Sequence, residues 1–120
     1  MSTVEWRWLL YVKLIVVERV AFVMQLHKGC EEEYRRRHAS LWPELASLLR
    51  DTGIRDYSIF LDEETLRLFA ILQIDDAAKL DDLAEEPVMR RWWEYMKELM
   101  DTNADGSPVV RPLKEMLYLP

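Results

Sequence analysis

Hydrophobic residues recur with a two-residue period in some segments of this chain and with a three-to-four-residue period in others. The order of these segments along the chain limits the possible folds more than any other feature. A two-residue period is typical of a half-buried strand, and a three-to-four-residue period of a helix that packs one face on a core. A first strand is predicted over residues 20–26, where large apolar side chains occupy alternate positions. Gly29 ends this pattern, and residues 31–50 then follow the helical period. Pro43 is expected to kink or restart that helix, because proline lacks a backbone N–H.

The remaining predicted elements complete a recognisable order. Strands are predicted over 55–61 and 66–74, a short helix over 75–84, a helix over 88–100 that Pro87 opens, and a last strand over 113–119 that runs to the C-terminus. The order β-α-β-β-α-β predicts an α+β fold, a ferredoxin-like sandwich in which one face of a sheet carries both helices. The other face needs a cover, and a second subunit is the simplest one. A dimeric α/β barrel is therefore expected.

Length, charge and cysteine content narrow the function. A chain of 120 residues fits one domain. Its 16 basic and 22 acidic residues give a net charge of −6, which argues against nucleic-acid binding and disfavours a phosphorylated substrate. The single cysteine, Cys30, excludes an intrachain disulfide and favours the cytoplasm. With three glycines and no Cys/His cluster, neither a cofactor nor a metal is predicted.

Residues 1–18 are predicted to form an extension ahead of a single domain over 19–120. Glu5, Arg7 and Lys13 interrupt the apolar run of this extension, so it is too short and too charged to span a bilayer. It also lacks the order of basic, apolar and small residues that marks a signal peptide. An extra strand or helix, a flexible leader, and residues upstream of the true start all remain open.

Tyr34 and His38 are the first candidates for chemistry. Residues four apart share one face of a helix, so a hydroxyl and an imidazole would point together into an apolar space. Histidine gives and takes protons near neutral pH, and both polar ends would need partners, which a polar ligand can supply. The alternative is a core histidine bonded to the backbone. The neighbouring Arg35, Arg36 and Arg37 follow three glutamates by four residues, which favours a solvated helix flank, and no role is assigned to them.

Trp92 and Trp93 are candidates for a wall that stacks on a carbohydrate, and Tyr57 is a further aromatic residue whose alternative role is packing on the sheet. Adjacent helical residues point about 100° apart, so one tryptophan can face the core while the other reaches a cleft wall. Core packing alone is the alternative for either ring. Tyr57 alternates in phase with Ile59 and Leu61, which places its ring on one face of a strand.

Several short motifs, taken in order, resemble those of the L-rhamnose mutarotase family. They are Phe22–Gln25, Tyr34–His38, Trp42–Leu45, Asp56–Ile59, Arg91–Trp93, Asn103–Pro108 and Tyr118–Pro120. The resemblance runs from residue 19 to residue 120 and implies a ferredoxin-like fold, a homodimer, and an enzyme without metal or cofactor. It also implies that His38 is the proton donor and that Tyr34, Tyr57, Trp92 and Trp93 contact the sugar. The first 18 residues and the loop at 27–30 depart from the family pattern.

The implied reaction is the interconversion of the α and β anomers of L-rhamnose by acid/base ring opening and closure. Histidine can protonate the ring oxygen and take the proton back on closure, while a tyrosine or a water handles the other proton. The expected ligand is thus a small uncharged sugar, with no membrane partner. Two other interpretations stay open: a cofactor-free monooxygenase of the dimeric α/β-barrel type, and a non-catalytic module that binds a sugar or a partner protein.

Overall fold

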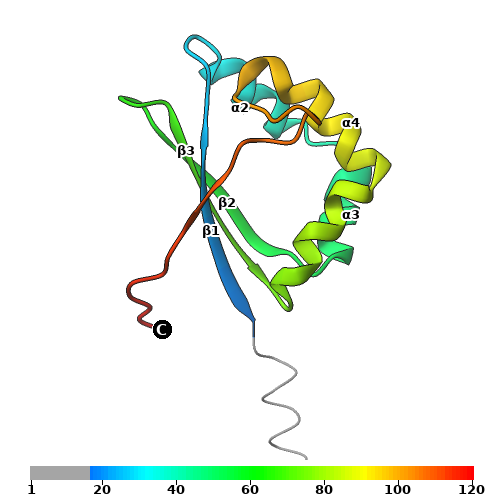
Figure 1. Ribbon diagram of the computed structural model, residues 1–120, viewed down its shortest axis with the longest axis vertical. Helices are drawn as coiled ribbons and strands as arrows, with labels where there is room; N and C mark the ends of the chain where they lie inside the picture. Colours follow the sequence, from blue (N-terminus) through cyan, green and yellow to red (C-terminus); the bar gives the residue numbers. More distant parts are fainter. Residues whose placement is uncertain (1–16) are drawn as a thin grey trace, which may run out of the picture.

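A single sheet with helices on one face makes up residues 17–120, the part of the chain that the computed structural model describes (Figure 1). Its strands within this range are β1 (Glu18–Gln25), β2 (Arg55–Asp62), β3 (Arg67–Ile74) and β4 (Arg111–Leu113). They lie in the order β2-β3-β1-β4, and every neighbouring pair is antiparallel. This arrangement confirms the α+β, ferredoxin-like prediction. Of the extension predicted over residues 1–18, residues 1–16 lie outside the described range.

The predicted helix over residues 31–50 is two helices, α2 (Glu31–Ala39) and α3 (Pro43–Asp51). Trp42, with a ψ of 129°, has the extended backbone that a following proline favours. Pro43 then occupies the first turn of α3, where a missing N–H leaves no hydrogen bond unmade. Proline therefore restarts the helix rather than kinking it.

The elements after the hairpin are shorter or tighter than the sequence pattern predicts. The helix expected over residues 75–84 is a 3₁₀ helix, η1 (Ala77–Glu85), whose first turn is capped by the Asp76 carboxylate through the Ala78 N–H. The helix expected over 88–100 starts at its proline as α4 (Pro87–Met96) and then tightens into η2 (Lys97–Leu99). No helix among residues 17–120 combines the length and the apolar composition that a membrane crossing requires.

The hydrophobic core lies between the sheet and the helices. Alternate residues of β3, namely Leu68, Ala70, Leu72 and Ile74, are all at most 2% exposed. Leu45 of α3 and Met96 of α4 belong to the same buried cluster. Burial of one such aliphatic side chain is worth about 1.5–3 kcal/mol, so this contact fixes where both helices sit on the sheet.

The prediction of a last strand over residues 113–119 is wrong. β4 covers Arg111–Leu113 and pairs with β1 only at Ala21–Val23. Beyond Leu113 the tail is held by side chains: Arg19 pairs with Glu115 at 3.0 Å and its guanidinium lies 3.6 Å from the ring centre of Tyr118. The tail runs away from the domain (Figure 1), and Met116, Leu117 and Leu119 are more than 80% exposed. Its alternating apolar pattern thus does not reflect pairing within this sheet.

Candidate active site

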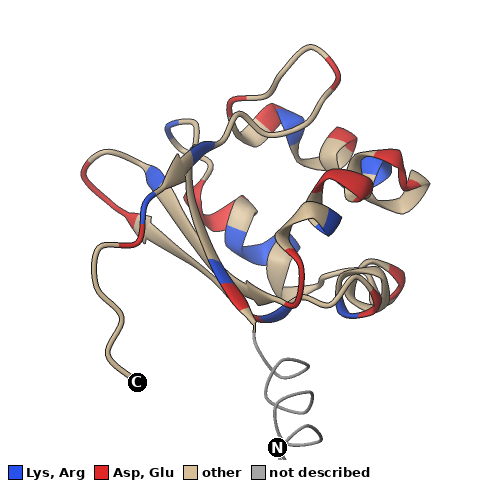
Figure 2. Cartoon of the chain, turned by 60° about the horizontal axis from the view of Figure 1, so that its bottom comes forward, with Lys and Arg blue, Asp and Glu red and all other residues tan. Residues whose placement is uncertain are grey.

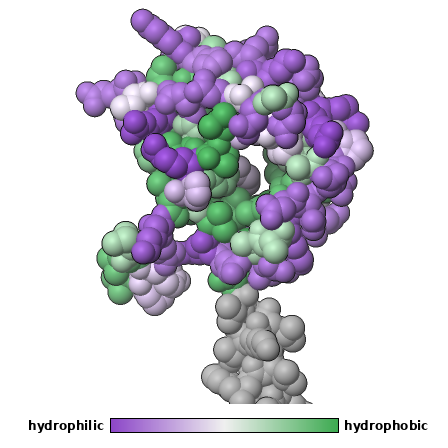
Figure 3. Space-filling view, viewed as in Figure 1, coloured by the Kyte–Doolittle hydropathy of each residue, from purple (hydrophilic) through white to green (hydrophobic). Residues whose placement is uncertain are grey.

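A cavity of about 1250 Å³ opens between the sheet and helices α2 and α3. The space-filling view shows this hollow, with hydrophobic residues along its sheet side (Figure 3). Tyr34 and His38 of α2 line it together with Tyr57, Ile59 and Leu61 of β2. The structure therefore brings three of the five predicted site residues to one cavity. Because Tyr57, Ile59 and Leu61 all line this cavity, the prediction that they share one face of the strand is confirmed.

His38 is held in one orientation by its own helix. Its Nδ1 lies 3.0 Å from the backbone carbonyl oxygen of Tyr34, and the two rings stack with centres 4.3 Å apart. A carbonyl only accepts, so Nδ1 carries the hydrogen and the neutral ring keeps the lone pair on Nε2. Burial lowers the pKa of His38 below its ordinary value of 6.5, against a smaller opposing effect of the carbonyl. At neutral pH the imidazole is thus an uncharged acceptor.

Trp92 packs against His38 and does not itself line the cavity. The two rings meet edge to face, with centres 5.4 Å apart at an angle of 89°. Trp92 is 5% exposed and also contacts Trp42 and Tyr95, at centre distances of 5.1 and 5.7 Å. Trp93 is half-buried against the core. Neither member of the pair is among the residues that line the cavity.

A β-bulge sets the position of Tyr57. Arg55 pairs with Gln73 and Ser58 with Ile71, so Asp56 and Tyr57 together face the single residue Leu72. Asp56 has a φ of 49°, in the left-handed region that aspartate tolerates better than most residues. Such bulges bend a strand and re-aim its side chains. Asp56 and Tyr57 both line the cavity as a result.

Both cavity tyrosines hold their protons firmly. Desolvation by surrounding atoms raises the pKa of Tyr57 to about 12, although 39% of the residue is exposed. Burial raises the pKa of Tyr34 as well, with a smaller contribution from the neighbouring Tyr57 phenol. Near neutral pH both hydroxyls are therefore hydrogen-bond donors and not bases.

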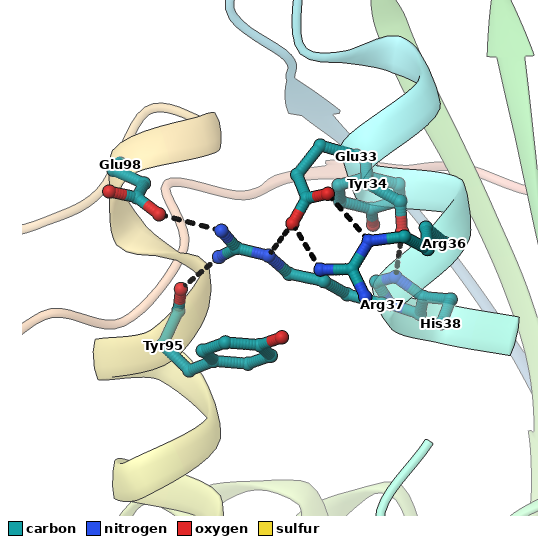
Figure 4. A network of polar contacts seen from close by, with 7 residues as sticks. All are labelled: Glu33, Tyr34, Arg36, Arg37, His38, Tyr95 and Glu98. Atoms are coloured by element: carbon teal, nitrogen blue, oxygen red, sulfur yellow. Dashed lines mark hydrogen bonds and ion pairs between the residues drawn. The ribbon is translucent and has the colours of Figure 1, made fainter. Parts of the chain in front are cut away.

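The expectation of a solvated arginine flank is wrong for Arg37, which is 9% exposed. Its Nε donates to Glu33 at 2.7 Å, its Nη2 donates to Glu98 at 2.7 Å, and its Nη1 donates to the carbonyl oxygen of Tyr95 (Figure 4). Arg36 shares the Glu33 carboxylate but points to solvent, with 62% of its side chain exposed. Acidic and basic residues are spread over the helices of the domain (Figure 2).

Three further residues around the site were not predicted from the sequence: Trp42, Tyr95 and Asp56. Tyr95 follows Trp92 by one helical turn, so their shared face was readable from the spacing. Trp42 stacks on Tyr95 with ring centres 5.6 Å apart, a contact between two separate helices that no local pattern reveals. The left-handed backbone of Asp56 likewise has no sequence signal, since aspartate occurs in many loops. Within residues 17–120, no group of three or more potential ligands could hold a metal ion.

Comparison with known proteins decides the family. The family model described as L-rhamnose mutarotase matches residues 19–119. The chain belongs to the L-rhamnose mutarotase family. The L-rhamnose mutarotase of Burkholderia ambifaria (strain MC40-6) is 50% identical over 104 residues, which cover 87% of this chain and 100% of that protein. The motif resemblance found in the sequence is thereby confirmed.

Two solved structures support the fold assignment. The crystal structure of the L-rhamnose mutarotase from Formosa agariphila is 46% identical and has a TM-score of 0.80, covering 86% of this chain and 99% of that one. A dimeric ferredoxin-like protein of unknown function from Jannaschia sp. CCS1 is 18% identical, with a TM-score of 0.52 over 82% of this chain and 100% of that one. The second likeness concerns the fold alone. As a member of the L-rhamnose mutarotase family, the chain is a carbohydrate isomerase that exchanges anomers.

Proposed function

We propose that this enzyme interconverts the α and β anomers of L-rhamnose, with His38 as its catalytic residue. The observation that carries the proposal is the orientation of His38: its Nδ1 is engaged by the Tyr34 carbonyl, and the ring lies on a cavity lined by aromatic, aliphatic and charged residues. Family membership supplies the substrate. The geometry supplies a nitrogen that is free to exchange a proton with it.

One nitrogen can serve both proton transfers, because the anomeric oxygen and the ring oxygen are bonded to the same carbon. Nε2 of His38 takes the proton of the anomeric hydroxyl. The bond from the anomeric carbon to the ring oxygen then breaks as the aldehyde forms, and the Nε2 proton passes to the ring oxygen. The open aldehyde turns about one bond and closes by the reverse steps. No proton is gained or lost overall, and the imidazolium exists only within the cycle.

The other predicted site residues orient the sugar in this proposal. The hydroxyls of Tyr34 and Tyr57 stay protonated and donate hydrogen bonds to sugar oxygens. Ile59 and Leu61 offer an apolar wall for the methyl group of L-rhamnose. Trp92 acts by holding the His38 ring, and Trp93 is proposed to contact the sugar on the evidence of the family motif alone. Because this reaction is already fairly fast in water without a catalyst, positioning of the sugar together with one acid/base group suffices.

A polarimetric assay tests the activity. A single crystalline anomer of L-rhamnose is dissolved at neutral pH, and the relaxation of optical rotation is followed at several protein concentrations. The proposal predicts a rate constant that increases linearly with protein. Binding of the sugar without acceleration would instead indicate the non-catalytic module. Oxygen uptake with an aromatic substrate, and no effect on the sugar, would indicate the monooxygenase.

We also propose that two copies associate through the sheet face that carries no helices. Cross-strand register aligns Ser58, Ile71, Ala21 and Leu113 in one row on this face, and Phe60, Phe69, Val23 and Arg111 in the next. Phe60 is 61% exposed and Ile71 45%, which is unusual for such large apolar side chains unless a partner covers them. The apolar C-terminal tail, also exposed, supports the same association.

The free thiol of Cys30 favours a cytoplasmic enzyme.

A further inference from the structure

Arg37 lies outside the cavity but is the most extensively bonded charged side chain near it. We propose that Arg37 is a positioning residue, which fixes helix α2 against α4 so that His38 meets Trp92 in the geometry required for proton transfer. This inference rests on the proposed role of His38. It assigns a function to the one arginine of the triplet that is buried.

The contacts of Arg37 span two helices that are far apart in the sequence. Within α2 its Nε is bonded to Glu33, one turn earlier. Across the interface its two terminal nitrogens reach the Tyr95 carbonyl of α4 and the Glu98 carboxylate of η2 (Figure 4). The planar guanidinium also covers the Tyr95 ring, 4.2 Å from its centre. Only arginine can hold this fork and this stack together, because a lysine ammonium has neither the plane nor the spacing.

A short chain of packed aromatic rings connects the Arg37 contacts to His38, whose Nε2 is the proposed reacting nitrogen. Tyr95, beneath the guanidinium, meets the Trp92 ring at 5.7 Å between centres. Trp92 in turn meets His38 at 5.4 Å. His38 follows Arg37 directly in the chain, so a shift of α2 along α4 moves the imidazole and its aromatic support relative to each other. A displacement near 1 Å at a reacting group can cost about 100-fold in rate.

Exposed ion pairs elsewhere on the helices provide a contrast. Lys97 with Glu94, and Lys79 with Asp75, join residues of one local segment and leave about half of each side chain in solvent. Such pairs contribute little and constrain no interface. Arg36 is the matched control, because it bonds the same Glu33 carboxylate at 2.7 Å, has 62% of its side chain exposed, and approaches α4 only at the Tyr95 side chain. Loss of Arg36 removes a charge next to Glu33 but leaves the Arg37 hydrogen bonds to the Tyr95 carbonyl and to Glu98 in place.

The test compares Arg37→Ala, Arg37→Lys and Arg36→Ala by anomer-exchange kinetics and by NMR titration of His38. We expect Arg37→Ala to lower kcat by about 10-fold or more with a small change in KM, since the reacting group and not the sugar contacts is displaced. The titration midpoint of His38 should move up toward 6.5 as its aromatic cover loosens. Arg37→Lys should recover part of both effects, and Arg36→Ala should match the wild type.

Wild-type kcat and an unmoved His38 titration in Arg37→Ala would overturn the inference. So would an equal loss in Arg36→Ala, which would assign the effect to charge at Glu33. If Arg37→Ala does not fold, Glu98→Gln weakens one arm of the same fork at a side chain that is 68% exposed. Glu98→Gln should lower kcat and raise the titration midpoint of His38, each by less than Arg37→Ala does. Wild-type values of both would refute the proposal. The titration needs no sugar, so it stays informative even if the wild type fails to exchange rhamnose anomers.

Discussion

At the scale of single residues, the chemistry depends on one imidazole whose two nitrogens have different partners. Nδ1 faces the Tyr34 carbonyl, and Nε2 is left for the substrate. The sequence predicted that Tyr34 and His38 share a helix face, and the stacked rings confirm it. It could not predict the tautomer, because the backbone carbonyl acts only once the ring has adopted one rotamer.

Replacing His38 with alanine should therefore remove most of the catalysis. We expect the rate constant for anomer exchange to fall by about 10²–10⁴-fold, the usual contribution of one general acid/base group. Circular dichroism should show an intact fold, because His38 lies on the cavity and not in the buried cluster. His27→Ala is the matched control: this exposed histidine pairs with Asp101 and should be dispensable. Full activity in folded His38→Ala would contradict the assignment.

The lowered pKa of His38 predicts the pH dependence of the reaction. The proposed cycle begins with a neutral ring, so kcat/KM should be constant well above the His38 pKa and should fall as the pH drops through it, below 6.5. The measurement is the enzyme-dependent rate after subtraction of the buffer-catalysed rate, with the midpoint compared to the NMR titration of His38. Activity that rises toward acidic pH would instead mean that the resting enzyme carries the imidazolium.

At the scale of elements, the regular parts of the sequence were predictable and the interruptions were not. Strand β3 follows its alternation without error, and Pro43 marks the start of α3. The bulge at Asp56 inserts one residue without disturbing the apolar phase of Tyr57, so the pattern gives no sign of it. Arg37 was misassigned because its spacing from Glu33 fits a surface ion pair equally well, and its contacts across to α4 are not local.

The left-handed backbone at Asp56 makes a prediction about this bulge. Asp56→Val places a β-branched residue at a φ of 49°, whereas Asp56→Gly removes the same carboxylate without the steric cost. We expect the valine variant to have a free energy of unfolding about 1–2 kcal/mol lower than the glycine variant, and a higher KM because Tyr57 is re-aimed. Urea denaturation and kinetics of the two variants provide the comparison. Equal stability would show that the bulge does not require this backbone conformation.

At the scale of the whole molecule, the fold leaves one sheet face and the C-terminal tail without cover from residues 17–120. The element order correctly predicted that the helices share the other face. The tail was mistaken for a strand because Leu117 and Leu119 alternate with Met116 and Tyr118, yet they lie beyond the three residues of β4 that pair with β1. An alternating pattern predicts an apolar face but does not say which surface covers it.

Replacement of Phe60 by lysine should break the proposed dimer. A charge at this 61% exposed position would be buried without a partner in the interface, which is costly. Analytical ultracentrifugation should show the wild type as a dimer and Phe60→Lys as a monomer at the same concentration. Glu85→Lys, on the exposed side of η1, introduces a lysine on the helical layer and should remain dimeric. A monomeric wild type would rule out the sheet-face association.

Saturation-transfer NMR can show in one experiment whether this chain exchanges the anomers of L-rhamnose and whether His38 is responsible. One anomeric proton signal of L-rhamnose is saturated at a neutral pH where the free sugar shows little transfer, with wild-type protein or with His38→Ala. We expect transfer to the other anomer with the wild type and almost none with the variant. Absence of transfer with folded wild-type protein would contradict the proposed activity, and equal transfer with both proteins would contradict the role of His38.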